Sequence, residues 1–248
     1  MTKELKLQER HKYYLLGYII ADGCLCTSSK GYDFIQIATT DAPMAKQLSK
    51  ILKTKATRFK TKWKMRYTIN IWNREYVDWY KSQGIIKRKT GKEVYPEVDP
   101  EYKNHFIRGF FDGDGMVIIY KKLLISGFAC ASREFLLKLR RDISDYAGVS
   151  IDAGTMRKEN DAECYKLKYS ISDTIRLCRF LYKDADIYME RKKNTYLSFV
   201  RDIASQRLYV QGQGKGKGSH KWVKIKSELY GDIESIPKEE YQYIKFVL

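Results

Sequence analysis

The sequence has few histidines and no long apolar run, and these shortages argue against several classes of protein. Its 248 residues include three histidines, His11, His105 and His220, which are too few to favour a zinc site or a histidine-based nuclease. No apolar run approaches the ~20 residues needed to span a bilayer. The start, Met1–Leu5, lacks the hydrophobic core of a signal peptide. We therefore expect an intracellular protein, cytoplasmic or organellar, that is not secreted.

Cysteine is also sparse, and its spacing carries no motif. The five cysteines are odd in number and none form a CxxC pair, so we expect them to be reduced and mostly buried. They are Cys24, Cys26, Cys130, Cys164 and Cys178. P-loop and Rossmann fingerprints are absent as well. With 44% hydrophobic residues, the chain is an ordinary globular sequence long enough for a substantial core.

Acidic residues are outnumbered by basic ones. Asp plus Glu is 30 against 47 for Lys plus Arg, which gives a net charge of +17. Such an excess favours a polyanionic partner. Nucleic acid is the first choice and an anionic membrane surface is the competing one.

Two short stretches repeat one apolar pattern. The first is Leu15–Gly23 and the second is Ile107–Gly115; each has Gly at the third place and ends in a small residue, Asp and Gly. The acids are 114 − 22 = 92 residues apart. In each copy two small residues, four positions apart, share one helical face and permit a close helix–helix contact. We predict that the two helices pack against each other.

The acids Asp22 and Asp114 would then lie together at one end of the helix pair. Each is in the last turn, where the helix dipole is already negative. Two carboxylates in that position repel each other, and a divalent cation with oxygen ligands would relieve the repulsion.

These repeats resemble the LAGLIDADG motif of homing endonucleases in its two-copy, single-chain form. The resemblance covers residues 10–200 and implies that Asp22 and Asp114 bind the catalytic metal, with Ala21 and Gly113 beside them. The sixth place differs between the copies, Ile20 against Asp112. In the family a basic residue follows the last helix of each half, and Lys89 and Lys192 match that place. Arg88 and Arg191 adjoin them.

The resemblance and the local patterns agree on an α+β fold. Two pseudo-symmetric halves each read helix, strand, strand, helix, strand, strand, helix, and each has a four-stranded antiparallel sheet. We expect a first half over residues 1–95, a second over 96–204, and a basic, Gly-rich linker and tail over 205–248. Asp41, Ser132 and Asp173 are expected helix N-caps. Predicted helices span 13–22, 41–52, 75–82, 102–114, 132–146 and 173–182; predicted strands span 24–28, 34–39, 55–62, 65–72, 116–121, 124–131, 150–158 and 163–172.

One face of each sheet must meet something other than core. Basic, amide and hydroxyl side chains on that face reach base edges and phosphates, and the family uses such a saddle to bind DNA. The candidates are Lys60, Lys62, Arg66, Thr68, Asn70, Arg157, Lys158, Lys166 and Lys168. In the family a polar residue often ends the second strand, where Thr39 and Cys130 stand here, so the two sub-sites are expected to be unequal.

The resemblance implies a monomeric, site-specific double-strand DNA endonuclease used in intron homing. It would hydrolyse phosphodiester bonds with Mg²⁺ and leave short 3′ overhangs. Mn²⁺ would substitute, and Ca²⁺ would support binding without cleavage. The alternatives are an RNA-binding maturase that assists intron splicing and a transcription regulator with the same fold. An intein is disfavoured, since the ending Val247-Leu248 lacks the His-Asn pair that self-splicing needs.

Overall fold

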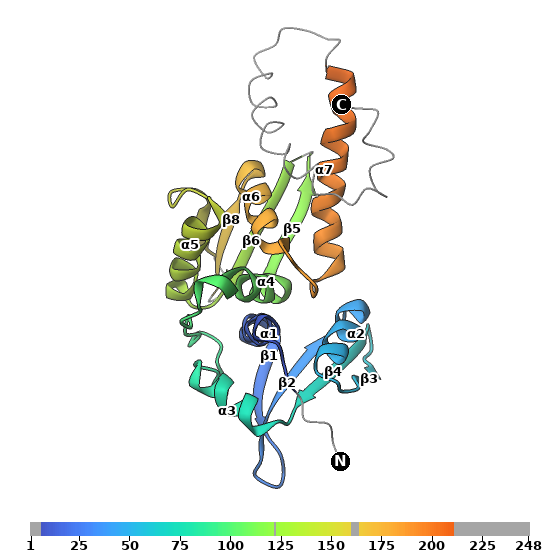
Figure 1. Ribbon diagram of the computed structural model, residues 1–248, viewed down its shortest axis with the longest axis vertical. Coiled ribbons are helices and arrows are strands. Elements are labelled where there is room, and N and C mark those ends of the chain that lie inside the picture. The colour runs from blue at the N-terminus through green and yellow to red at the C-terminus, as the bar shows by residue number, and fades with distance from the viewer. Residues whose placement is uncertain (1–5, 122, 160–163, 211–248) are drawn as a thin grey trace.

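The structure is a computed structural model that describes residues 6–121, 123–159 and 164–210, the side chains of 203–210 excepted. Its two halves repeat one order of elements (Figure 1). The first half contains α1 (Glu9–Asp22), β1 (Gly23–Thr27), β2 (Asp33–Thr39), α2 (Ala42–Ile51), β3 (Thr57–Lys60), β4 (Met65–Ile71) and α3 (Arg74–Ser82). The second contains a 3₁₀ turn (Pro100–Tyr102), α4 (Lys103–Asp114), β5 (Gly115–Tyr120), β6 (Leu123–Cys130), α5 (Arg133–Ala147), β7 (Thr155–Lys158), β8 (Tyr165–Tyr169), α6 (Ile171–Tyr182) and α7 (Glu190–Val210).

Each half builds one antiparallel sheet with the same topology. The first sheet has the order β1-β2-β4-β3 and the second β5-β6-β8-β7. Alternation along the strands places one set of side chains against the helices. In the first sheet this inner face carries Ile35, Ile37, Ile69 and Ile71, all buried. We call the opposite face of each sheet the outward face. The helices of its own half do not cover it.

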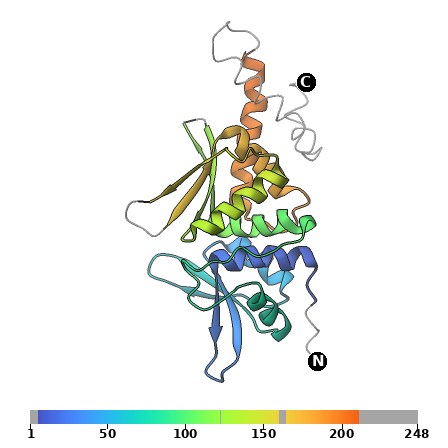
Figure 2. The same cartoon turned by 90° about the vertical axis from the view of Figure 1, so that its left-hand side faces the viewer.

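Helices α1 and α4 pack side by side between the two sheets (Figure 2). Glycine is required where they touch. A Cβ on Gly17 would lie 2.1 Å from the carbonyl oxygen of Phe106, and one on Gly109 would lie 1.9 Å from that of Tyr14. The two backbones are therefore in direct contact, as the repeated motif predicts.

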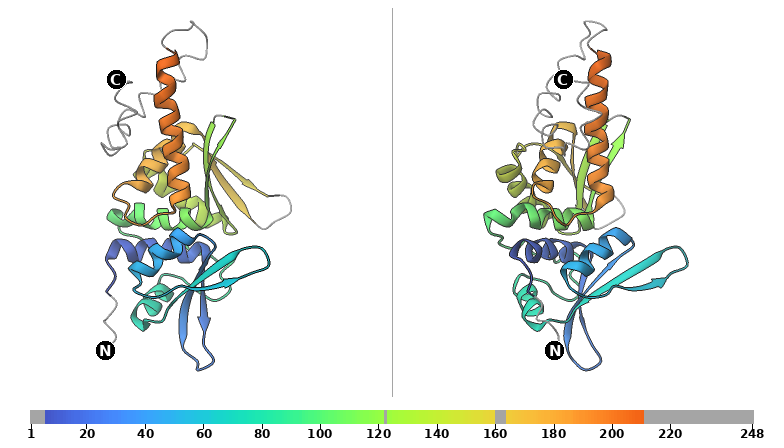
Figure 3. Two further views of the ribbon diagram at one scale, coloured as in Figure 1. Left: turned by 90° about the vertical axis from the view of Figure 1, so that its right-hand side faces the viewer. Right: turned by 45° about the vertical axis from the view of Figure 1, so that its right-hand side comes forward.

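The halves are also joined by the segment between α3 and the 3₁₀ turn, and by an ion pair from Arg191 at the start of α7 to Asp41, at 3.6 Å. Ile85, Pro96 and Val98 of the joining segment are buried. Helix α7 starts beside the α1–α4 pair and extends away from it (Figure 3). It packs through Tyr196, Phe199 and Val200, three or four residues apart. Among the described residues no helix is both long and apolar enough to cross a membrane.

Sequence and structure agree closely on the elements. Asp41 and Ser132 cap α2 and α5 by accepting from the backbone N–H groups of Met44 and Phe135. The Asp173 expectation is wrong, because α6 starts at Ile171 and Asp173 lies in its first turn. Helix α7 is additional to the predicted helices. The tail from residue 211 onward, and Glu163 of an expected strand, lie outside the described residues.

Candidate active site and nucleic-acid interface

Asp22 and Asp114 are the last residues of α1 and α4, and the helix packing places them at the same end. A Cβ on Gly113 would lie 2.2 Å from the Cβ of Ala21 and 3.6 Å from the Cγ of Asp22. Desolvation by the surrounding helix ends raises the pKa of Asp114 to about 6, and the charge of Asp22 adds to this shift. The pKa of Asp22 is raised as well, chiefly by desolvation. The two carboxylates therefore interact electrostatically.

Two lysines adjoin the pair and hold the helix ends. Lys89 Nζ donates to the carbonyl oxygen of Ala21 at 3.2 Å. Lys192 Nζ donates to the carbonyls of Phe111, Asp112 and Gly115, the second at 2.9 Å. These carbonyls belong to the helix ends, where backbone carbonyls lack the partners of the helix interior. The Phe111 carbonyl also accepts from the backbone N–H of Gly115. Both ammonium groups lower the pKa of Asp22 against the effect of burial.

The donor set fits a hard divalent cation. Magnesium is commonly held by one or two carboxylates, with water and substrate phosphate completing its shell. Asp22 and Asp114 supply two carboxylates, and Ala21 and Gly113 bring backbone next to them. Among the described residues no group of three or more His, Cys, Asp or Glu side chains gathers to hold a metal. A cation held by these two carboxylates would take its remaining ligands from water and phosphate.

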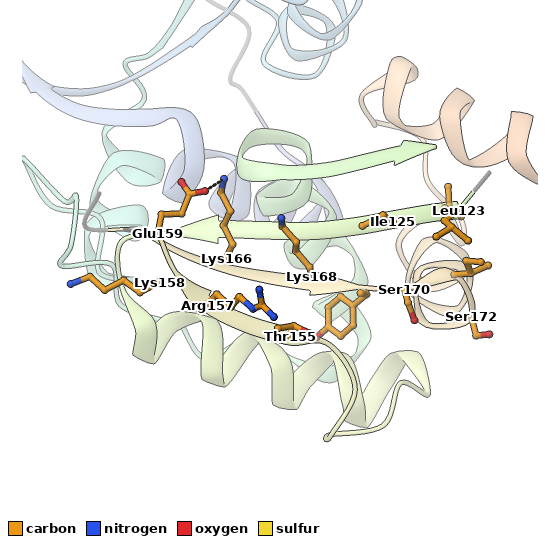
Figure 4. Close-up of a pocket in the computed structure, with 13 residues that line it drawn as sticks. Leu123, Ile125, Thr155, Arg157, Lys158, Glu159, Lys166, Lys168, Ser170 and Ser172 are labelled. Atoms are coloured by element: carbon orange, nitrogen blue, oxygen red, sulfur yellow. Dashed lines mark hydrogen bonds and ion pairs between the residues drawn. The ribbon is translucent and has the colours of Figure 1, made fainter. Parts of the chain in front are cut away.

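The outward faces of the two sheets form the second part of the candidate site. Residue pairing across β2 and β4 places Gln36, Thr68 and Asn70 on the outward face of the first sheet. In the second sheet, Arg157 pairs with Lys166, and Lys168 lies two residues further along β8 on the same face. These cations line a hollow of about 920 Å³ (Figure 4). The β3–β4 and β7–β8 hairpins project to the same side of the molecule (Figure 3).

Comparisons with known proteins agree with this architecture. Residues 9–83 match a family model described as a LAGLIDADG-like domain. A structure of the homing endonuclease I-DmoI superimposes with a TM-score of 0.52 at 15% identity, covering 73% of this chain and 94% of that one. A structure of the meganuclease I-SmaMI bound to DNA superimposes with a TM-score of 0.52 at 13% identity, covering 89% of this chain and 98% of that one. The fold is the two-domain LAGLIDADG fold.

Two further solved structures are similar to this chain. An I-SmaMI structure with uncleaved DNA and calcium ions has a TM-score of 0.50 at 14% identity, covering 90% of this chain and 98% of that chain. The N-terminal LAGLIDADG domain of DUF199/WhiA also has a TM-score of 0.50, at 15% identity, covering 75% and 87%. No curated protein sequence matches the chain. These likenesses establish the fold, and the activity has to be argued from the site.

Within the LAGLIDADG fold the two acids have different surroundings. Asp22 borders a hollow of about 490 Å³ that is also lined by Thr39, Arg66 and Arg191. Near Asp114 lie an acid and a thiol, Glu93 and Cys130, which interact electrostatically with it. Thr39 and Cys130 end β2 and β6, the equivalent strands, as expected. The first sub-site is thus richer in positive charge than the second.

Sequence reasoning missed a buried acid in the second LAGLIDADG helix. Asp112 is fully buried, and burial raises its pKa to about 6. It accepts from the hydroxyl of Tyr14 at 2.8 Å and from the backbone N–H of Met189 at 3.0 Å. Met189 directly precedes α7, so Asp112 holds the segment from which Lys192 projects. The signal in the sequence was an acid within an apolar helix, where Ile20 stands in the first copy.

Two of the expected nucleic-acid contacts lie elsewhere. Lys60 pairs with Met65, so the register places it on the opposite side of the sheet from Arg66. Lys158 pairs with Tyr165, next to the Arg157–Lys166 pair, and it lines the same hollow as Lys166 (Figure 4). Lys62 lies in the β3–β4 turn with its ammonium over the ring of Trp63. A one-residue change of register moves a side chain to the other face, which is why their faces could not be predicted.

The cysteine expectation is partly wrong. All five thiols are free, but only Cys130 and Cys178 are buried. Cys24 and Cys26 alternate with the buried Leu25 on β1 and therefore share the outward face. Their sulfur atoms are 3.4 Å apart.

Proposed function

We propose that this protein is a site-specific double-strand DNA endonuclease that uses a divalent metal ion. The observation that carries the proposal is the placement of Asp22 and Asp114 at one end of the α1–α4 pair, between two outward sheet faces. Carboxylates of like charge at helix C-termini are unfavourable without a cation, so their pairing here indicates a metal-dependent role.

The sheets and the net charge supply the binding part of the function. A net charge of +17 favours a polyanion, and the exposed strand side chains include the types that contact bases and phosphates. The related I-SmaMI structures hold DNA in the same fold. DNA lying across both sheets would bring its two strands to the helix ends that carry Asp22 and Asp114.

At the helix ends, the residues of this chain have separate tasks. Asp22 and Asp114 would hold Mg²⁺ or Mn²⁺, with Ala21 and Gly113 at the same place, and one acid would serve each DNA strand. When bound, the metal supplies an activated water and stabilises the leaving 3′ oxygen. Lys89 and Lys192 keep the helix ends in position and add positive charge near the scissile phosphates. Hydrolysis at both strands would leave short 3′ overhangs.

Cleavage of a randomised DNA library tests the proposal and identifies the target in the same experiment. Purified protein is incubated with the library in Mg²⁺, in Ca²⁺ and in EDTA, and the new DNA ends are sequenced. We expect defined double-strand ends at one long site in Mg²⁺ only, and binding without cleavage in Ca²⁺. Absence of cleavage with every metal, together with tight binding to structured intron RNA, would replace the proposal with the maturase function.

A further inference from the structure

Equivalent positions on the outward faces of the two halves carry different types of side chain. Gly23 pairs with Ile37 where β1 begins, and Gly115 pairs with Phe128 where β5 begins. Counting along the strands from these pairs superimposes the two registers. The facing pair Gln36 and Asn70 of the first sheet then corresponds to Gly127 and Lys168 of the second.

The equivalent pairs lie on the central strands of each sheet. Strands β2 and β4 occupy the middle of the first sheet, as β6 and β8 do in the second. A duplex lying along each sheet would therefore present its groove to these positions, while its phosphates would lie nearer the edges and hairpins. Side chains on the central strands are placed to contact base edges.

In the first sheet the central outward positions are neutral. Gln36 Nε2 donates to the Oδ1 of Asn70 at 3.2 Å, so the two amides form one joined unit. Thr68 lies beside them on the same face. The one cation on this face among the described strand residues is Arg66, which lines the hollow beside Asp22 and so belongs to the cleavage centre.

In the second sheet the same positions are cationic and bordered by apolar side chains. Lys168 and Arg157 have no carboxylate within ion-pair distance among the described residues, whereas Lys166 pairs with Glu159. Gly127 faces Lys168, and the Lys168 side chain lies close over it, since a Cβ on Gly127 would be 3.2 Å from the Lys168 Cγ. Ile118 and Ile125, which pair across β5 and β6, provide an apolar strip on this face.

The outward side chains of the two sheets therefore match the edges of different bases. Asn and Gln amides match the adenine N6 and N7 atoms, Lys and Arg match the guanine O6 and N7 atoms, and apolar side chains contact the thymine methyl group. We propose that the DNA target is non-palindromic in a specific way: at the same distance from its centre, the first half-site carries adenine opposite Gln36 and Asn70, and the second carries guanine opposite Lys168, next to thymine. This inference rests on the proposed function and specifies its substrate.

A binding selection tests the assignment. The variant Asp22→Asn/Asp114→Asn, which is expected to bind without cutting, is incubated with a randomised duplex library, and the bound DNA is sequenced. In this background, Lys168→Gln is expected to remove a guanine preference of about 10- to 100-fold at one position of the second half-site. The first half-site should be unchanged. Lys138→Gln removes an exposed lysine of α5, on the helix side of the sheet, and should leave every base preference unchanged.

A transplanted pair gives the sharper result. Gln36→Gly/Asn70→Lys places the second-sheet pair in the first sheet, and we expect the first half-site to change from adenine to guanine at that position. The reverse change is unsuitable, because a side chain at Gly127 would lie 2.7 Å from the Leu167 carbonyl oxygen. Thermal unfolding of each variant establishes that it is folded.

The outcomes separate the two proposals. Binding without any base preference contradicts the site-specific function, and the half-site inference with it. Clear base preferences that survive Lys168→Gln, or a transplanted pair that leaves the first half-site at adenine, overturn the half-site inference and leave the proposed function intact.

Discussion

At the scale of single residues, the two motif acids occupy positions that are unfavourable for the fold in the absence of a cation. Both lie in the last turn of a helix, and each raises the energy of the other's charged form. The lysines Lys89 and Lys192 offset part of this effect. Residues kept at a cost in stability point to function.

This cost predicts that neutralising the Asp114 carboxylate stabilises the folded protein, and that the gain depends on pH. The pKa of Asp114 is about 6 in the folded protein and lies near 3.9 in an unfolded chain. Stability from this group is therefore complete below pH 4 and falls as the pH rises through 6. Without metal, Asp114→Asn should raise the Tm by about 1–2 °C at pH 7.5 and leave it unchanged at pH 4. Differential scanning fluorimetry in EDTA measures this, and a lower Tm at pH 7.5 would contradict it.

Lys192 is predicted to matter for folding as well as for the site. Lys192 is 2% exposed, and its ammonium donates to three backbone carbonyls at the end of α4. Lys192→Met removes the ammonium from all three acceptors, of which the Phe111 carbonyl keeps the Gly115 N–H, and should lower the free energy of unfolding by about 2–4 kcal/mol. Lys183→Met, on an exposed side chain, is the matched control and should change it by less than about 0.5 kcal/mol. Urea unfolding measures both, and equal values for the two variants would show that the caps contribute nothing.

At the scale of elements, the contact between α1 and α4 positions everything else. Its backbone approach leaves no room for a side chain at Gly17 or Gly109. Gly17→Val should separate the helices and destabilise the protein by more than about 3 kcal/mol. Lys138→Val introduces the same side chain on the exposed face of α5 and should cost less than about 1 kcal/mol. Near-native stability of Gly17→Val in urea unfolding would contradict the helix contact.

The elements that could be predicted from sequence are those with local determinants. Asp41 and Ser132 stand before apolar periodic segments, so their helices could be located from capping and spacing alone. The start of α6 was misplaced because Ser170, Ser172 and Asp173 are all capping residue types close together. Helix α7 was missed because charged residues dominate its first turn, and its buried apolar residues, Tyr196, Phe199 and Val200, come only after that turn in the described part of the helix.

The candidate site could be predicted only in its repeated part. Asp22 and Asp114 followed from two copies of one motif, whereas Asp112 and Glu93 are single residues without a counterpart in the other half. Lys60 was assigned to the wrong face because strand register is set by tertiary pairing. Positions that depend on contacts between distant segments could not be derived from local sequence.

At the scale of the whole molecule, the charge and the paired sheets would determine how the proposed endonuclease meets DNA. A net charge of +17 predicts strongly salt-dependent association, since each neutralised phosphate releases counterions. Between 50 and 200 mM salt, affinity for a duplex of unrelated sequence should fall by about 10³-fold or more. Fluorescence anisotropy at several salt concentrations measures the slope, and a salt-independent affinity would contradict a phosphate-tracking interface.

The pairing of Asp22 with Asp114 is the central claim, and single-acid variants on the identified target test it most directly. Wild-type protein, Asp22→Asn and Asp114→Asn are compared in Mg²⁺ for double-strand cleavage, and in Ca²⁺ for binding. We predict that each variant loses double-strand cleavage while its affinity for the target stays within about threefold of the wild type, since one interaction at the cleavage centre contributes little to the binding of a long site. Cutting of both strands by both variants would show that these carboxylates do not form the metal site.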